Sequence, residues 1–174
     1  MLSMTKKKIA LIGSAPSSVR LAPFKDPEWF IFGCSPGAYG AAGPYAHAWM
    51  ENHRFEPQVP GHVGTGQPWF SPEYCEYLAR FKGDVWMNAP LPPEIPNAKV
   101  LPMEDLVEKY GPYFMTSSLS WMFALALETP GVEEIGLWGV DMSASDEYGY
   151  QRAGCQYFIT LAVQRGIRVT VPPE

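Results

Sequence analysis

Small and hydroxylated residues follow several apolar runs of this chain, and their types suit the binding of an anion. The first such segment comes after the run at residues 9–12 and consists of Gly13, Ser14, Ala15, Pro16 and Ser17. Ser35 follows the run at residues 29–32, and Thr116, Ser117 and Ser118 precede a long apolar stretch. Backbone N–H groups in such segments, above all at helix N-termini, attract phosphate. The pattern therefore predicts a pocket for a nucleotide or a nucleotide-sugar.

The same residues also have an ordinary structural interpretation. Ser and Thr are preferred at helix N-caps, which would explain Ser17, Thr116 and Ser117 taken singly. Their occurrence together at strand ends favours the pocket. The chain contains neither G-x-x-x-x-G-K-[ST] nor G-x-G-x-x-G, so a P-loop and the usual dinucleotide fingerprint are excluded.

Three residues are candidates for a catalytic acid or base. Asp141 ends the apolar run 134–140, and Glu147 follows it closely. A carboxylate at a strand end can deprotonate an acceptor hydroxyl when it is buried, but Asp141 fits equally well as a cap on the following turn. His53 comes two residues after Glu51 at another strand end and is the third candidate.

A polar, ring-bearing cluster follows at residues 148–152. Arg152 has the planar fork that clamps phosphate or carboxylate, and Tyr150 has a ring that can stack on a base. The alternative is the exposed start of a surface helix.

The chain offers no protein-only metal site, because H-E-x-x-H and C-x-x-C are both absent. Mg²⁺ held through substrate phosphates and Asp141 remains an alternative. The three cysteines have unrelated spacings, which indicates neither a disulfide framework nor a zinc site and makes a reducing cytoplasm the expected location. They are expected to be packing residues, with Cys34 the one candidate for an exposed, reactive thiol.

The elements that position these residues alternate between strands and helices. Such alternation predicts a single Rossmann-like α/β domain over residues 1–174, with a mostly parallel sheet and helices on both faces. We expect strands at 9–12, 29–32, 46–50, 84–88, 99–101, 134–140 and 167–171, and helices at 73–81, 103–109, 119–127 and 153–165. In sheets of this type, ligands bind beyond the carboxyl ends of the strands.

Proline, glycine and aromatic residues concentrate in a predicted loop insertion at about residues 52–72. The chain has 18 prolines and 16 glycines, and a long loop of this kind in a compact domain is usually functional. We interpret it as a stiff, ring-bearing cover beside the pocket. The same loops favour a homodimer.

Charge and hydropathy exclude other classes of protein. The net charge of −5 and the pI near 5.2 argue against nucleic acid as a partner. No run of eighteen apolar residues occurs, which excludes a membrane-spanning helix. The expected partner is therefore a small-molecule nucleotide ligand.

The segments ALIGSAPSS, FIFGCS and FMTSSLSWMFALALETPGVEEIGLWGVDMS resemble the Rossmann-like bacterial sialyltransferases. They also resemble the related flagellin-modification and hydroxymethylpterin diphosphokinase-like proteins. The chain as a whole is similar to small proteins of tailed bacteriophages, through a Y-x-Y-Q-R run near its C-terminus. That likeness implies the cytoplasm of a bacterial host.

The resemblance implies that the segment from Gly13 to Ser17 surrounds nucleotide phosphates and that Asp141 is the acidic residue ending the penultimate strand. Two positions depart from the family pattern, because Ser35 stands in place of Asn and Ser118 in place of Gly. The histidine base that the sialyltransferases have after this strand is missing, since residues 143–152 contain no histidine.

Three functions remain open from the sequence. The first is a transferase that moves a glycosyl or phosphoryl group from an activated nucleotide donor. The second is a non-catalytic accessory protein of the same fold that binds or sequesters a nucleotide. The third is a structural or interaction protein in which the phosphate loop is vestigial.

Overall fold

The computed structural model describes residues 1–2, 5–55, 70–141 and 146–172, the side chains of residues 146–148 and 150 excepted. Its strands form a seven-stranded sheet in the order β5-β4-β3-β2-β1-β6-β7, and each pair of neighbours is parallel. The strands are β1 (Lys8–Ile12), β2 (Trp29–Cys34), β3 (Ala48–Glu51), β4 (Asp84–Met87), β5 (Ala98–Val100), β6 (Glu134–Trp138) and β7 (Arg168–Thr170). The predicted α/β fold with a parallel sheet is confirmed.

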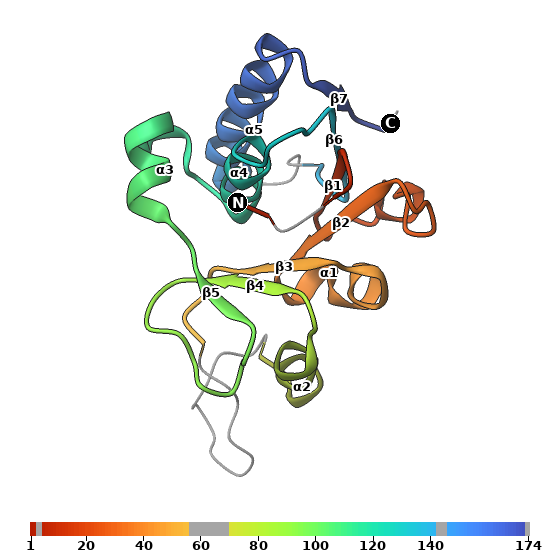
Figure 1. Ribbon diagram of the computed structural model, residues 1–174, viewed down its shortest axis with the longest axis vertical. Helices are drawn as coiled ribbons and strands as arrows, with labels where there is room; N and C mark the ends of the chain where they lie inside the picture. The colour runs from red at the N-terminus through yellow and green to blue at the C-terminus, as the bar shows by residue number, and fades with distance from the viewer. Residues whose placement is uncertain (3–4, 56–69, 142–145, 173–174) are drawn as a thin grey trace.

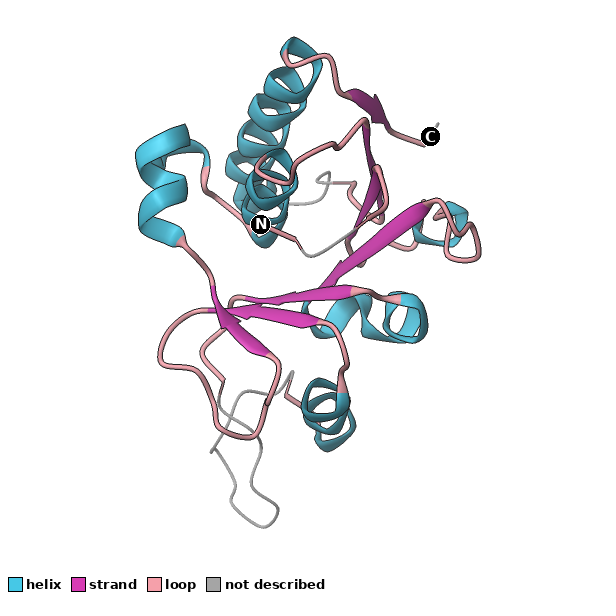
Figure 2. Cartoon of the chain, in the orientation of Figure 1, coloured by secondary structure: helices cyan, strands magenta, loops and turns pink. Residues whose placement is uncertain are grey.

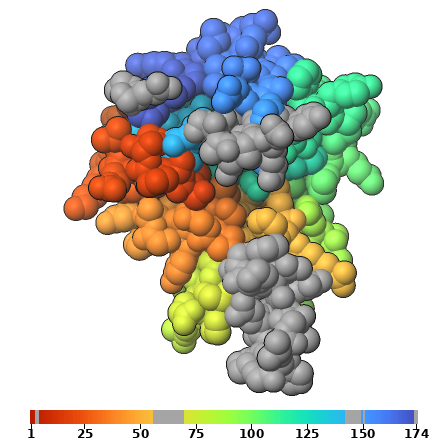
Figure 3. Space-filling model, turned by 180° about the vertical axis from the view of Figure 1, so that it is seen from behind, coloured from red at the N-terminus to blue at the C-terminus, as the bar shows by residue number. Residues whose placement is uncertain are grey.

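Helices cover both faces of the sheet (Figures 1 and 2). The α-helices are α1 (Ser35–Ala42), α2 (Pro72–Arg80), α3 (Met103–Tyr110), α4 (Ser118–Leu127) and α5 (Asp146–Gln164), and the short 3₁₀ helices are η1 (Val19–Leu21), η2 (Gly43–Tyr45) and η3 (Pro112–Phe114). Helices α1 and α2 lie on one face, whereas α3, α4 and α5 lie on the other. Seen from behind, the space-filling view shows α5 in blue at the upper end and α2 in yellow-green at the lower end (Figure 3).

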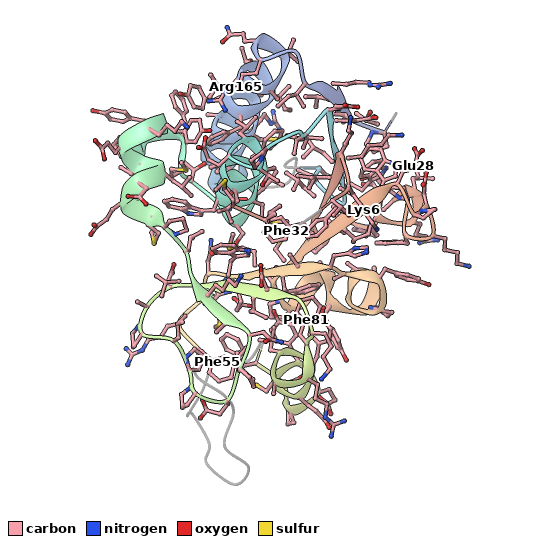
Figure 4. All side chains as sticks on the ribbon, in the orientation of Figure 1. Lys6, Glu28, Phe32, Phe55, Phe81 and Arg165 are labelled. Carbon is pink, nitrogen blue, oxygen red and sulfur yellow. The ribbon has the colours of Figure 1, made fainter. Side chains whose placement is uncertain are left out.

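The core is divided between these two faces by the alternation of side chains along each strand. In β1, Ile9 and Leu11 pack toward α4, while Ala10 and Ile12 pack toward α1. All four are fully buried, as expected for a strand covered on both faces. Figure 4 shows the same division, with Phe32 on the α4 side of the sheet and the labelled ring of Phe81 on the α2 side.

The order of strands reverses between β1 and β6. From β1, the chain adds β2, β3, β4 and β5 on one side and then crosses to add β6 and β7 on the other. The chain after β1 and the chain after β6 lead to elements on opposite faces of the sheet, and the carboxyl edge at such a switch point is the usual location for a ligand in this class of fold.

Three local features of the structure differ from what the sequence indicated. The segment Gly13–Ser17 leads into the single 3₁₀ turn η1, not into a regular helix, and Pro23 follows that turn closely. Helix α1 was not predicted, because three glycines and a proline among residues 35–43 mask its alanines. Helix α5 starts at residue 146 and not at 153, since Gly149 interrupts the helical pattern in its first turn.

Most of the predicted loop insertion at residues 52–72 lies outside the described residues, so its use as a cover stays a prediction. Its described end packs in the core, where Phe70 is fully buried and contacts Phe55 edge-on. Among the described residues, no helix combines the length and the apolar character needed to cross a membrane.

Candidate functional site

The loops after β1 and β6 are bonded to each other across the switch point. The N–H group of Gly13 donates to the Trp138 carbonyl at 2.8 Å, and that of Ala15 donates to the Gly139 carbonyl at 2.9 Å. The Ser18 hydroxyl accepts from the Gly139 N–H at 2.9 Å. A Cβ atom on Gly13 would lie 2.3 Å from the Gly139 carbonyl oxygen. The two glycines thus allow backbone-to-backbone contact that no side chain would permit.

Asp141 is held at the end of this pair of loops by Ser17, whose hydroxyl donates to its Oδ1 atom. Both residues are exposed. The role of Asp141 as a base stays a prediction, and the turn that it would alternatively cap lies outside the described residues. Ser17 bridges two loops in the structure and does not cap a helix.

Ser35 stands in a strained conformation where β2 turns into α1. Its φ is 53°, and it is the non-glycine residue with positive φ among the described residues. A residue held there costs roughly 1–3 kcal/mol, and such positions cluster at functional sites. Asn adopts this conformation more readily than most residues.

We predict that two substitutions of Ser35 will reveal the backbone strain at this position. Ser35→Asn should leave the free energy of unfolding unchanged or slightly higher. Ser35→Val should lower it by roughly 1–2 kcal/mol, because a β-branched side chain is poorly accommodated at positive φ. Urea denaturation measures both values. Equal stabilities of the two variants would contradict the strain assigned to this turn.

The turn before α4 is pressed against α5. The Ser117 hydroxyl accepts from the Ser120 N–H at 3.3 Å, so Ser117 is an N-cap, as its structural interpretation predicted. In α5, a Cβ atom on Gly154 would lie 2.6 Å from Thr116 Oγ1 and 2.7 Å from Ser120 Oγ. This close packing fixes the turn and directs the N-terminus of α4 toward the carboxyl edge of the sheet.

A buried carboxylate supports His53 at the end of β3. Glu51 is fully buried, and its Oε1 atom lies 2.6 Å from His53 Nδ1 and accepts from the His53 backbone N–H at 3.0 Å. The hydrogen bond to Glu51 raises the pKa of His53 above its ordinary value, and the carboxylate charge adds to this rise against the opposing effect of burial. With Nδ1 directed at Glu51, proton exchange with a ligand would take place at Nε2.

These elements enclose a cavity of about 820 Å³ at the carboxyl edge. Most of the predicted site residues line it: Gly13, Ser14, Ala15, Pro16, Ser35, His53, Thr116, Ser117, Ser118 and Asp141. The N-termini of two α-helices, α1 and α4, open into it together with the β1 loop. Its described lining contains no Lys or Arg. An anion would therefore be held by amides, hydroxyls and the histidine.

Comparison with known proteins yields one weak structural likeness. No protein-family model matches this chain, and no curated protein matches it. A thiamine pyrophosphokinase from Bacillus subtilis, known from its crystal structure, is 12% identical and superposes on 95% of the chain with a TM-score of 0.49. This chain spans about 60% of the length of that protein. The resemblances to sialyltransferases and bacteriophage proteins stay predictions.

Some predicted residues are not placed in the cavity. Arg152 is exposed on α5 and is not among the described residues that line the cavity. Glu147 and Tyr150 lie in the first turns of α5, but their side chains are outside the described part of the chain. Ser17, which is bonded to Asp141, is likewise not among the lining residues. The role of these four residues in binding or catalysis stays a prediction.

Other lining residues were not foreseen as ligand contacts. Asn52 and Gln151 contribute polar side chains, and Trp121 contributes a ring from α4. Asn52 stands at a strand end, which is the same signal that identified Ser35, so the sequence could have revealed it. Cys34 also lines the cavity, but burial raises the pKa of its thiol to about 12. Cys34 is 7% exposed, so the expected packing role agrees with the structure and the alternative of an exposed thiol does not.

Within the described residues, no three His, Cys, Asp or Glu side chains are grouped so as to hold a metal ion. Binding of Mg²⁺ through substrate phosphates and Asp141 stays a prediction.

Proposed function

We propose that the protein binds a nucleotide or nucleotide-sugar in this cavity and transfers a glycosyl or phosphoryl group from it to an acceptor hydroxyl. One observation carries the proposal: amide-rich loops, two helix N-termini and a carboxylate-supported histidine line the same cavity at the switch point. The first two groups suit phosphate, and the third suits proton transfer.

The phosphate end of the ligand belongs between the β1 loop and the N-termini of α1 and α4. The backbone of the β1 loop comes close to any ligand there, because Ser14 is exposed and Gly13 has no side chain. Helix N-termini stabilise negative charge that develops on a leaving phosphate. This arrangement would lower the barrier to breaking the bond between the donor group and the nucleotide.

His53 is the proposed general base, in place of the histidine missing after β6. The acceptor oxygen attacks the carbon or phosphorus atom of the donor group, and its proton passes to His53 Nε2. The nucleotide phosphate then leaves with the electron pair of the broken bond. Glu51 balances the positive charge that His53 acquires.

A thermal-shift screen with CMP, CDP, UDP, ADP and their sugar conjugates tests the binding step. A nucleotide at one hundred times its Kd stabilises a protein by about 2.7 kcal/mol. For a chain of this length we expect Tm to rise by roughly 5–10 °C. Absence of a shift with every nucleotide would rule out both the transferase and the binding-protein functions.

A charge placed in the β1 loop should locate the bound phosphate. We predict that Ser14→Asp weakens the affinity for the nucleotide found in the screen roughly tenfold or more, because like charges repel at close range. Thr5→Asp is the matched control, since it adds the same charge at an exposed residue before β1. Equal affinities of the two variants, measured by calorimetry, would place the phosphate elsewhere.

A further inference from the structure

A chain of hydrogen bonds leads from the interior of the protein to His53. The indole N–H of Trp49 donates to the Tyr74 hydroxyl oxygen at 2.8 Å, and the Tyr74 hydroxyl donates to Glu51 Oε2 at 2.6 Å. The other oxygen, Oε1, contacts His53. Trp49 and Glu51 are fully buried and Tyr74 is 1% exposed. Each oxygen of the carboxylate thus has its own partner.

Local sequence accounts for this alignment. Trp49 and Glu51 are two residues apart in β3, so their side chains lie on the same face of the sheet. Helix α2 covers that face, and Tyr74 lies in its first turn, where its backbone N–H donates to the Ser71 cap at 3.3 Å. The cap sets the start of the helix and hence the height of the Tyr74 ring above the strand.

A buried carboxylate needs partners, because an unpaired charge in the interior is costly. Tyr74 is a neutral donor, and burial together with the nearby Glu51 charge raises its pKa further above the ordinary value. The hydroxyl therefore keeps its proton at every pH of interest and leaves the negative charge of Glu51 in place for His53. It also prevents the carboxylate from rotating away, since Oε2 is tied to the helix.

We propose that Tyr74, itself held by Trp49, is a positioning residue that orients His53 through Glu51. The role in transfer rests on the proposed function, whereas the orientation of the ring does not. Among the described residues, the other titratable groups lining the cavity are Asp141 on the β6 loop and Cys34 at the end of β2, and Glu51 is the carboxylate in contact with His53.

The neighbouring Tyr77 offers a matched control. Its ring stacks near Tyr74, with centroids 6.2 Å apart, and packs edge-on against Trp49 at 5.0 Å. Its hydroxyl is buried and has no hydrogen-bond partner in the described part of the chain. Tyr77→Phe therefore removes a hydroxyl from the same aromatic cluster without touching Glu51.

The decisive experiment is an NMR titration of the His53 ring in the full-length protein, without any nucleotide. We expect Tyr74→Phe to raise the pKa of His53 by roughly 0.5–1 pH unit, because the buried carboxylate then loses the donor on Oε2 and depends more strongly on His53. Glu51→Gln should instead lower the pKa and release the Nδ1–H tautomer that Glu51 favours. Tyr77→Phe should change neither. A His53 pKa in Tyr74→Phe equal to that in Tyr77→Phe would overturn the proposal.

A second substitution guards against loss of packing in Tyr74→Phe. Replacing the Tyr74 ring with 3-fluorotyrosine keeps its shape but makes the hydroxyl a stronger donor. The pKa of His53 should then fall, which is the opposite of the change in Tyr74→Phe. A fall with fluorination supports the proposal even if Tyr74→Phe does not fold, and an unchanged pKa refutes it.

The transfer assay gives an independent result. In Tyr74→Phe the pH–rate profile should move to higher pH, and the rate below the plateau should fall about three- to tenfold for a shift of that size. If the NMR change occurs without transfer by the natural protein, the positioning role stands and the proposed function fails. If transfer occurs and the profile stays unchanged in Tyr74→Phe, the positioning role fails.

Discussion

Gly139→Ala is expected to lower the free energy of unfolding by roughly 2–5 kcal/mol. Gly139 has a φ of +70°, where an L side chain is strained. In addition, its Cβ atom would lie 2.5 Å from the carbonyl oxygen of Gly13. Urea denaturation measures the loss. Because both glycines border the cavity, the nucleotide-induced rise in Tm should shrink in the same variant.

Gly131→Ala separates the two causes. Gly131 has a similar φ of +76°, but a Cβ atom there would meet nothing within 4 Å. Its cost should therefore be the conformational one alone, about 1–2 kcal/mol. The difference between the two variants isolates the contact between the β1 and β6 loops. Equal losses of unfolding free energy in the two variants would show that the β1 and β6 loops can move apart. Their close contact would then not contribute to stability.

The parts of the fold that could be predicted are those with strong local signals. The continuous apolar run of β1 requires burial on both faces, and Ser71 followed by Pro72 marks the start of α2. Because parallel strands end at a common edge, the residues after β1, β2 and β6 could be expected to meet there, and they line one cavity. The residues that follow predicted strands thus indicated the position of the cavity even though the strand order was unknown.

What could not be predicted depends on long-range contacts. The absence of a regular helix after Gly13 follows from bonds between residues more than 120 positions apart, such as that from Gly139 to Ser18. The burial of Glu51 depends equally on Tyr74, which stands 23 positions further along the chain in another element. In the sequence, Glu51 has no feature that distinguishes it from a solvated glutamate near a strand end.

Replacing the proposed base should have the largest effect on the reaction. We predict that His53→Gln lowers the rate of transfer roughly 10²–10⁴-fold, the range that a positioned general base contributes. Asp141→Asn should lower it much less, because Asp141 is exposed and bonded to Ser17. Single-turnover assays with the nucleotide donor found in the screen measure both. A larger loss in Asp141→Asn than in His53→Gln would make Asp141 the base.

The pH dependence provides the matching test in the natural protein. A base must be neutral, so the rate should rise as pH passes through the raised pKa of His53, above its ordinary value of 6.5. The free energy of unfolding should instead decrease as pH rises over this range. The pairing of His53 with Glu51 stabilises the fold fully below about pH 6.5, and this contribution is lost as pH rises through the folded-state pKa. The neutral form of His53, which acts as the base, is therefore the form that no longer makes an ion pair with Glu51. A rate that instead falls over the same pH range would show that His53 acts as an acid, donating its proton to the leaving group.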